Sequence, residues 1–312
     1  MSPLGINLGV LAQPSGWFIS IWDTRIISAG STTSNKVKLP LTSLGTYDFT
    51  VDWGDGNTDI ITAWNQAQVT HTYATEGTYT ITCKPNAPGQ MKGFAFANTG
   101  DRLKFSDVIQ FGGLQLVPTQ GQTFYGCANF TGASISDVLD TTGVTSMARM
   151  YQGCTSYNGP VDFNTSSVTN MSQMFYQATN FNQPVNFDTS SVTNMQQMFH
   201  LATSFNKPLN LNTSFVTNMS YMLAFATSFD QDISAWVIDQ VSNFFSFMAG
   251  TTLSTVNYDT LLIAWAAQAP LNPSATSIHF GNSKYTSTDS SVVSARNTLT
   301  THFTSFTDGG AA

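Results

Sequence analysis

The chain has 312 residues, of which 41% are hydrophobic and 12% aromatic, which is enough for two or three domains with buried cores. Only 9% of the residues are charged, against roughly 25% in typical soluble domains, so the surface must be built mainly from hydroxyl and amide side chains. The net charge is −7 and the eleven Lys and Arg residues are scattered. This distribution excludes a basic patch, and nucleic acid is therefore not an expected partner.

Residues 1–16 contain Gly and Pro, and we expect them to form a leader that anchors the chain to its neighbours. No Lys or Arg precedes Arg25, so the positively charged region of a secretory signal is missing. No run of 18 apolar residues occurs either, and we expect no insertion into a membrane.

Residues 17–86 are predicted to form an antiparallel β-domain. Apolar and polar residues alternate from Tyr47 to Trp53 and again from Tyr79 to Cys83, which is the period of half-buried strands. Gly54-Asp55-Gly56-Asn57 is a strong signal for a tight turn after the first of these strands.

The same turn contains a partial match to a calcium-binding loop. Asp55, Asn57 and Asp59 are spaced like its first three oxygen ligands. However, Ile60 replaces the required glycine, and Gln66 stands where a bidentate glutamate is needed. The pattern excludes an EF-hand and leaves these three residues as a candidate for a looser calcium site, with a turn closed by its own side chains as the alternative.

Residues 123–250 contain an internal repeat with a period of 24 residues. The motif V-T-N-M begins at Val168, Val192 and Val216. Between positions 171 and 178 the apolar residues have helical spacing, so we predict a two-turn helix there, followed by a very short strand at 185–187. Helices stack at about 8–10 Å and strands at about 4.8 Å, so a stack of such units should curve.

The segments on either side of the repeats are expected to cap them, because a terminal repeat has no neighbour on one face. Residues 87–122 form the cap that precedes the repeats. Residues 251–312 form the C-terminal cap, with a helix at 257–265, a strand at 277–280 and a helical pattern at 292–299.

The cysteine and histidine residues do not have metal-binding spacing. Cys83, Cys127 and Cys154 are predicted to be buried thiols, with a bridge between Cys127 and Cys154 as the alternative because these two occupy corresponding places in successive repeats. The four histidines stand in four different contexts, so we expect no metal, no cofactor and no catalytic role for them. His71 is predicted to be structural.

Asn and Asp residues recur along the repeats, and we expect hydrogen-bonded ladders that close the turns, with a polar array for carbohydrate as the alternative. They are Asp162, Asp188 and Asn212 in one series and Asn170, Asn194 and Asn218 in another.

Two resemblances to known families follow from these motifs. The stretch V-D-W-G-D-G at 51–56, followed by H-T-Y and G-T-Y-T-I within 69–82, resembles a PKD-type β-sandwich domain. The V-T-N-M repeats, the F-Y-G-C motif at 124–127 and the T-D-G-G motif at 307–310 resemble BspA-type leucine-rich-repeat surface proteins. Together they imply a mixed fold: an N-terminal all-β PKD/Ig-like sandwich, a curved leucine-rich-repeat-like α/β solenoid and a C-terminal α+β cap.

Members of the BspA-type family are mostly secreted or displayed on surfaces and carry no catalytic motif. The resemblance therefore implies a non-enzymatic recognition or adhesion protein.

Without an export signal, we expect it on a virion surface, as a capsid or tail component, with an extracellular or cell-surface location as the alternative. Its partners would be protein subunits of a larger assembly and a host surface protein or glycan, bound by the strand face and a loop at Asp137–Gly143. A purely architectural shell or tail protein is the main alternative, ahead of a carbohydrate-active enzyme or an ice- or crystal-binding protein.

Overall fold

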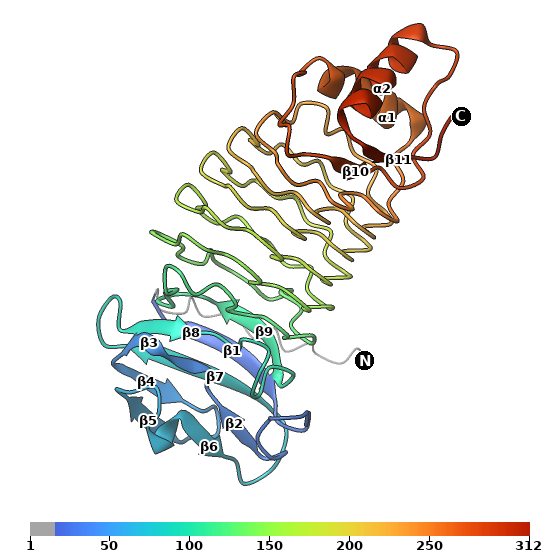
Figure 1. Cartoon of the computed structure of the whole chain (residues 1–312). Coiled ribbons are helices and arrows are strands. Elements are labelled where there is room, and N and C mark those ends of the chain that lie inside the picture. The colour runs from blue at the N-terminus through green and yellow to red at the C-terminus, as the bar shows by residue number, and fades with distance from the viewer. Residues whose placement is uncertain (1–15) are drawn as a thin grey trace, which may run out of the picture.

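The computed structural model describes residues 16–312, so the predicted leader and anchor lies outside the described residues apart from Gly16. Figure 1 shows three parts along one axis: small β-sheets at the N-terminal end, a stack of parallel coils, and two helices at the C-terminal end. One continuous hydrophobic core runs through all three parts.

The N-terminal part contains a five-stranded sheet in which all neighbouring strands are antiparallel. Phe49 and Val51 on one strand and Ile81 and Cys83 on its neighbour are buried, as the alternation of apolar residues predicts. In spatial order the strands are β5 (Thr58–Ile61), β4 (Phe49–Asp52), β7 (Thr78–Pro85), β1 (Phe18–Asp23) and β9 (Phe105–Gln110).

Two smaller antiparallel sheets complete this end of the molecule. One pairs β2 (Lys36–Lys38) with β6 (Thr70–Thr72), which follows a 3-10 turn, η1 (Ala67–Val69). The other pairs β3 (Leu41–Tyr47) with β8 (Met91–Phe94). The predicted domain boundary after residue 86 falls between β7 and β8 in sequence, yet β8 and β9 pair with β3 and β1. Both segments therefore contribute to the same group of sheets.

The free edge of β5 is partly covered by one side chain. Gln66 Nε2 donates to the Ile60 carbonyl at 2.7 Å, and Gln66 Oε1 accepts from the backbone N–H groups of Thr62 at 2.8 Å and Ala63 at 2.9 Å. Unpaired backbone groups on an outer strand can pair with another chain. The Gln66 amide therefore reduces the tendency of this edge to add a strand.

A buried ion pair fastens the loop before β2 to the turn before β9. Lys104 and Asp101 are both fully buried, with Lys104 Nζ 3.7 Å from Asp101 Oδ1. Lys104 Nζ also donates to the carbonyls of Thr33 and Lys36, each at 2.7 Å. Asp101 Oδ2 accepts from the Lys38 N–H at 2.7 Å. Burial lowers the pKa of Lys104, and the neighbouring carboxylate of Asp101 opposes this change.

The 24-residue repeats form coils that lie one above the other (Figure 1). Asn170, Asn194 and Asn218 occupy the same place in three successive coils and are joined by parallel bridges, which continue to Ser146 on one side and Asn243 on the other. The period of the sequence is therefore the length of one coil.

The segment predicted as a helix, residues 171–178, is a pair of tight turns. The N–H groups of Met171, Gln173, Phe175 and Gln177 donate to carbonyls of the next coil at 2.8–3.0 Å, which a helix would not allow. Gln173 and Gln177 both have φ values of 59°, in the left-handed region. The predicted strand at 185–187 is absent as well, because this segment is irregular in the structure.

The predicted fold class is therefore wrong. The described chain is mostly β, with two helices in the C-terminal part and small sheets, and it is not a PKD/Ig-like sandwich followed by a leucine-rich-repeat-like α/β solenoid. The reason lies in the turns: two successive four-residue turns also place positions 171, 174, 175 and 178 on the inner side, where all four side chains are buried. Periodicity alone does not distinguish this arrangement from a helix.

The left-handed positions allow a direct test. Gln177 is exposed and corresponds to Gly153 in the preceding coil, which has φ 70°. A β-branched residue is poorly tolerated at positive φ, so Gln177→Val is expected to lower the free energy of unfolding by about 1–3 kcal/mol. Urea denaturation measures this loss. The control is Asn210→Val, because Asn210 is also exposed and does not have positive φ. An equal effect at both positions would contradict the assigned backbone conformation.

Apolar side chains inside the stack form columns along its axis. The rings of Phe181, Phe205 and Phe229 follow one another at centroid distances of 5.8 and 6.0 Å and are nearly parallel. A second column includes Phe175 and Phe199, 5.4 Å apart. All five rings are fully buried. Each coil therefore contributes one layer to a core that no single repeat could form.

The C-terminal part contains the two predicted helices and the predicted strand. They are α1 (Thr255–Ala266), α2 (Ser290–His302) and β10 (Ser277–His279), which pairs in parallel with β11 (Ser305–Thr307). Asp289 caps α2 by accepting from the Ser291 N–H at 2.8 Å. Arg296 on α2 forms an ion pair with Asp308 at 2.7 Å, which fixes the helix to the C-terminal segment.

Candidate functional site

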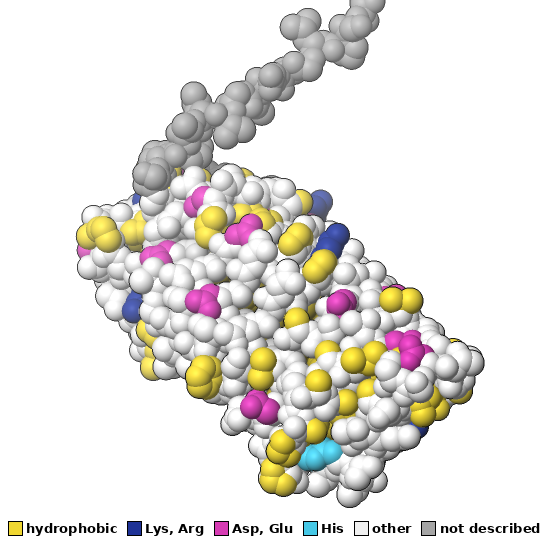
Figure 2. Space-filling view, turned by 90° about the horizontal axis from the view of Figure 1, so that it is seen from above, with side chains coloured by type: hydrophobic (Ala, Val, Ile, Leu, Met, Phe, Trp, Pro, Cys, Tyr) yellow, Lys and Arg dark blue, Asp and Glu magenta, His cyan; other side chains and the backbone are white. Residues whose placement is uncertain are grey.

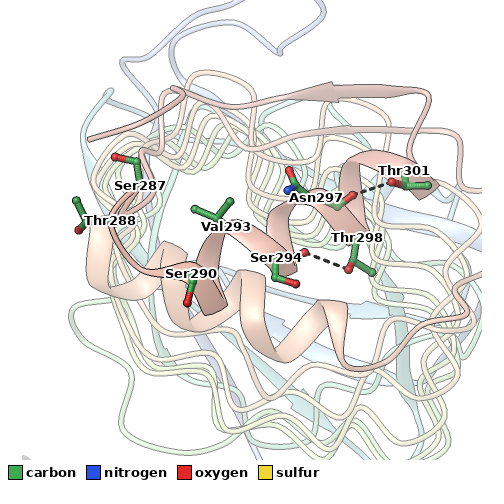
Figure 3. A pocket seen from close by; sticks show the side chains of 8 residues that line it. All are labelled: Ser287, Thr288, Ser290, Val293, Ser294, Asn297, Thr298 and Thr301. Atoms are coloured by element: carbon green, nitrogen blue, oxygen red, sulfur yellow. Dashed lines mark hydrogen bonds between the residues drawn. The ribbon is translucent and has the colours of Figure 1, made fainter.

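A shallow, open pocket lies along α2, and its lining consists mainly of Ser, Thr and Asn side chains from the helix and the preceding loop (Figure 3). Thr298 Oγ1 donates to the Ser294 carbonyl at 3.1 Å, and Thr301 Oγ1 donates to the Asn297 carbonyl at 2.8 Å. These hydroxyls bind the backbone of their own helix. The lining residues include no charged or ionisable side chain.

The calcium candidates do not point to a common centre. Asp55 accepts from the Asn57 N–H at 3.0 Å and contacts His71 Nε2 at 2.9 Å, whereas Asp59 accepts from Trp53 Nε1 at 2.9 Å. Within residues 16–312, no three His, Cys, Asp or Glu side chains come together as metal ligands would. The calcium site remains a prediction without support from this geometry.

His71 packs within a group of aromatic rings. Its imidazole stacks on Trp53 with 4.9 Å between centroids and meets Tyr73 edge-on at 4.5 Å. Burial favours the neutral form of the Asp55 carboxyl, but hydrogen bonds from His71 and Asn57 hold its pKa below the usual value. The contacts of His71 are those of a structural residue.

All three cysteines are free and buried. The thiol of Cys154 donates to the Phe124 carbonyl at 3.0 Å. Burial raises the pKa of Cys127 and of Cys154, so both remain protonated thiols rather than reactive thiolates. The alternative bridge between Cys127 and Cys154 is not present.

Most side chains of the Asn and Asp series accept hydrogen bonds from backbone N–H groups of their own coil. Asn170 Oδ1 accepts from the Ser172 N–H at 2.9 Å, and Asp188 Oδ1 accepts from the Ser190 N–H at 3.0 Å. The equivalent of Asp188 in the preceding coil is Asn164 and not Asp162, contrary to the predicted series. Asp162 Oδ1 instead accepts from Asn186 Nδ2 in the next coil at 3.2 Å. These side chains close turns, as predicted. The predicted ladder from coil to coil is not formed by the Asn170 and Asp188 side chains, which bond within their own coils.

One edge of the stack carries a row of partly exposed rings, which we call the aromatic row. The rings of Tyr176 and His200 are stacked at 5.0 Å, and those of His200 and Tyr221 at 5.6 Å. His200 also lies 6.0 Å from Phe225, and Tyr221 meets Phe245 edge-on at 5.3 Å. Phe225 is 44% exposed and Phe245 is 51% exposed. Such a row of aromatic side chains on a polar surface is typical of a recognition site.

A row of polar side chains, the amide row, runs beside it. Arg149 Nε donates to Gln173 Oε1 at 2.7 Å, and Gln173 Nε2 donates to Gln197 Oε1 at 2.7 Å. Gln197 Nε2 then donates to His200 Nδ1 at 3.3 Å, so the two rows meet at His200. The two rows together are the aromatic–amide stripe.

His200 is neutral near pH 7, because partial burial lowers its pKa. Since its Nδ1 accepts from Gln197, the proton of the neutral ring lies on Nε2. Within residues 16–312, neither His200 Nε2 nor the hydroxyls of Tyr176 and Tyr221 have a hydrogen-bond partner. These three polar groups are therefore available to a ligand.

The stripe itself carries little charge. Figure 2 shows a face of the molecule on which polar side chains and backbone dominate and charged side chains are isolated. Arg149 is the single permanent charge among the residues of the stripe. Contacts made here would depend on ring surface and hydrogen bonds, and salt would weaken them little.

The sequence-based expectation places the binding surface elsewhere, on the strand face and on the loop at Asp137–Gly143. In the structure, Asp137 of that loop is fixed by the backbone N–H groups of Phe111 and Gly112, at 2.7 and 2.8 Å. The signal that could have located the stripe is the non-core position of each repeat. Tyr176 and His200 occupy the same such position, and aromatic residues there have no role in the core.

Within the described residues, neither helix has the length and apolar character that crossing a bilayer requires.

No curated protein and no solved structure matches the chain. The matching family model carries the description "Mycoplasma protein of unknown function, DUF285", and it aligns with residues 95–186, 118–211 and 161–265. This family is related to BspA-like repeat proteins, whereas the region predicted as PKD-like, residues 17–86, lies entirely outside the match. The three matches together span residues 95–265, more than half of the chain. The chain therefore belongs to the DUF285 family of repeat proteins.

Proposed function

We propose that this chain is a non-enzymatic recognition protein that is displayed on the exterior of a cell or a virion and binds its target through the aromatic–amide stripe. The observation that carries the proposal is the stripe itself. It combines two half-exposed phenylalanine rings with three polar groups that have unfilled hydrogen-bonding capacity. Exposed aromatic side chains beside unsatisfied polar groups are the usual anchors of a binding surface.

The relation of the DUF285 family to BspA-like repeat proteins supports display on a surface. We propose that the kinship extends to the BspA-type surface proteins that the repeats resemble. The partners we propose are a surface protein or glycan of a host and the neighbouring subunits that hold the chain in place. The low fraction of charged residues fits contacts made through hydroxyls, amides and rings.

The test is an attachment assay with cells or particles that carry the chain. We expect excess soluble full-length protein to block attachment and the double variant Phe225→Ser/Phe245→Ser to lose most of this effect. The matched control is Phe215→Ser, because Phe215 is 64% exposed and lies outside the stripe. Near-wild-type thermal unfolding of both variants would show that they are folded.

Two outcomes of this assay would contradict the proposal. If excess soluble protein leaves attachment unchanged, the recognition role fails and a purely architectural role is favoured. If Phe215→Ser loses the blocking effect as fully as the double variant, the stripe is not the binding surface. Mass spectrometry of purified particles and of secreted medium distinguishes display on a virion from display on a cell.

A further inference from the structure

We infer that the aromatic–amide stripe binds a straight, uncharged, β-1,4-linked glycan that lies along the axis of the stack. This inference rests on the proposed recognition function and deepens it by naming the class of ligand. Three features carry it: the spacing of the stripe, the free polar groups, and its charge.

The spacing of the stripe matches a polymer with a short, regular repeat. One polar ring lies on each of three successive coils, and the centroid distances are 5.0 Å from Tyr176 to His200 and 5.6 Å from His200 to Tyr221, although Tyr221 stands three positions earlier in its repeat than the other two. Backbones joined by bridges lie about 4.8 Å apart. A β-1,4-linked hexose chain is extended and advances by a similar distance with each sugar. Successive sugars can therefore meet successive coils without losing register.

The free polar groups match the hydroxyls of sugars. The Tyr176 and Tyr221 hydroxyls can donate and accept, and His200 Nε2 donates in the neutral ring. Gln173 and Gln197 each use one amide hydrogen within the amide row, which leaves the second for a ligand. The stripe thus offers at least one hydrogen-bonding group per coil over three coils.

The rings provide different surfaces along the stripe. Tyr176, His200 and Tyr221 are within 23° of parallel to their neighbours, so their faces cover one another and their edges are directed to solvent. Phe245 is inclined by 72° to Tyr221 and is half exposed. This open ring surface suits the apolar face of a pyranose at the end of the bound chain.

The charge of the stripe favours a neutral ligand over an acidic one. Arg149 stands at one end, and the other members of the stripe are uncharged when His200 is neutral. A polyanionic glycan would need cations at regular intervals along its length. A folded protein partner would in turn need a larger desolvated apolar centre than two half-exposed rings provide.

The experiment is calorimetric titration of the full chain with two neutral β-1,4-linked probes, cellohexaose and chitohexaose. Maltohexaose, which is α-linked and curved, and heparin, which is anionic, are the controls. We expect at least one β-1,4 probe to bind at least tenfold more tightly than either control. The variant Tyr176→Phe/Tyr221→Phe, which removes only two hydroxyls, should weaken that binding by tenfold or more, and Phe215→Ala should leave it unchanged.

Absence of binding by both β-1,4 probes, equal binding of maltohexaose, or wild-type affinity of the double variant would overturn the inference. The attachment assay separates this failure from that of the proposed function. If wild-type soluble protein blocks attachment and the Phe225→Ser/Phe245→Ser variant fails to block it, while no β-1,4 probe binds, recognition by the stripe stands and its ligand is a protein or a different glycan.

Discussion

Replacing Lys104 with methionine is expected to lower the free energy of unfolding by about 3–5 kcal/mol, the usual loss when one partner of a buried ion pair is removed. Methionine has similar volume, so the loss would come from the polar groups left behind. The carbonyls of Thr33 and Lys36 would lose their donor at 2.7 Å, and the buried carboxylate of Asp101 would lose its countercharge. Urea denaturation followed by tryptophan fluorescence measures the effect.

The matched control is Lys84→Met, because Lys84 forms a partly exposed ion pair with Asp52 at 3.6 Å. Such pairs contribute about 0–1 kcal/mol, so this variant should unfold close to the wild type. Asp101→Asn should also be destabilising, and the double variant Lys104→Met/Asp101→Asn should lose less than the two single losses combined. Additive losses would show that Lys104 and Asp101 act independently, contrary to their contact in the structure.

The C-terminal helices could be predicted from the sequence because each combines several consistent signals. Tyr258, Leu261, Leu262 and Trp265 have helical spacing over a segment long enough for three turns, and all four are buried on α1. Asp289 is a good N-cap residue directly before α2. Length and periodicity agree for α1, and α2 adds a cap by Asp289, which leaves little room for another conformation.

The repeats show where such agreement fails. Between Met171 and Ala178 the spacing of apolar residues is helical, but the segment is only long enough for two helical turns and lies between repeats of similar sequence. Hydrogen bonds to the adjacent coils, such as Phe175 N–H to the Met198 carbonyl at 2.9 Å, replace those of a helix. Whether the backbone forms a helix or tight turns depends on hydrogen bonds with the adjacent coils, so the sequence of one repeat does not determine it. The period and the buried residues were nevertheless predictable, because they do not depend on how the backbone turns.

The candidate site was harder to predict than the fold. Tyr176, His200 and Tyr221 lie on different coils, and Tyr221 does not occupy the same position in its repeat as the other two. Only the stacking of coils brings these rings to centroid distances of 5.0 and 5.6 Å. The sequence indicates which positions are free of the core, but it does not show that they form one row.

Truncating Phe205 to alanine is expected to lower the free energy of unfolding by about 3–5 kcal/mol, as for other fully buried phenylalanines. The ring lies 4.2 Å from Phe199 within its coil and about 6 Å from Phe181 and Phe229 in the coils on either side. Its removal would open a cavity that three neighbouring rings cannot fill, because each is held by its own coil. Urea denaturation of the full chain measures the loss.

Phe215→Ala is the matched control, since it makes the same substitution ten residues later at a side chain that is 64% exposed. It should change the free energy of unfolding by less than about 0.5 kcal/mol. A loss below about 1 kcal/mol for Phe205→Ala would contradict the core column, because a cavity of that size cannot form in a close-packed interior at so little cost. Comparable losses in both variants would show that the effect of the substitution is not due to burial. A large loss confined to Phe205 would show that the coils are held together by the layers of rings that each contributes.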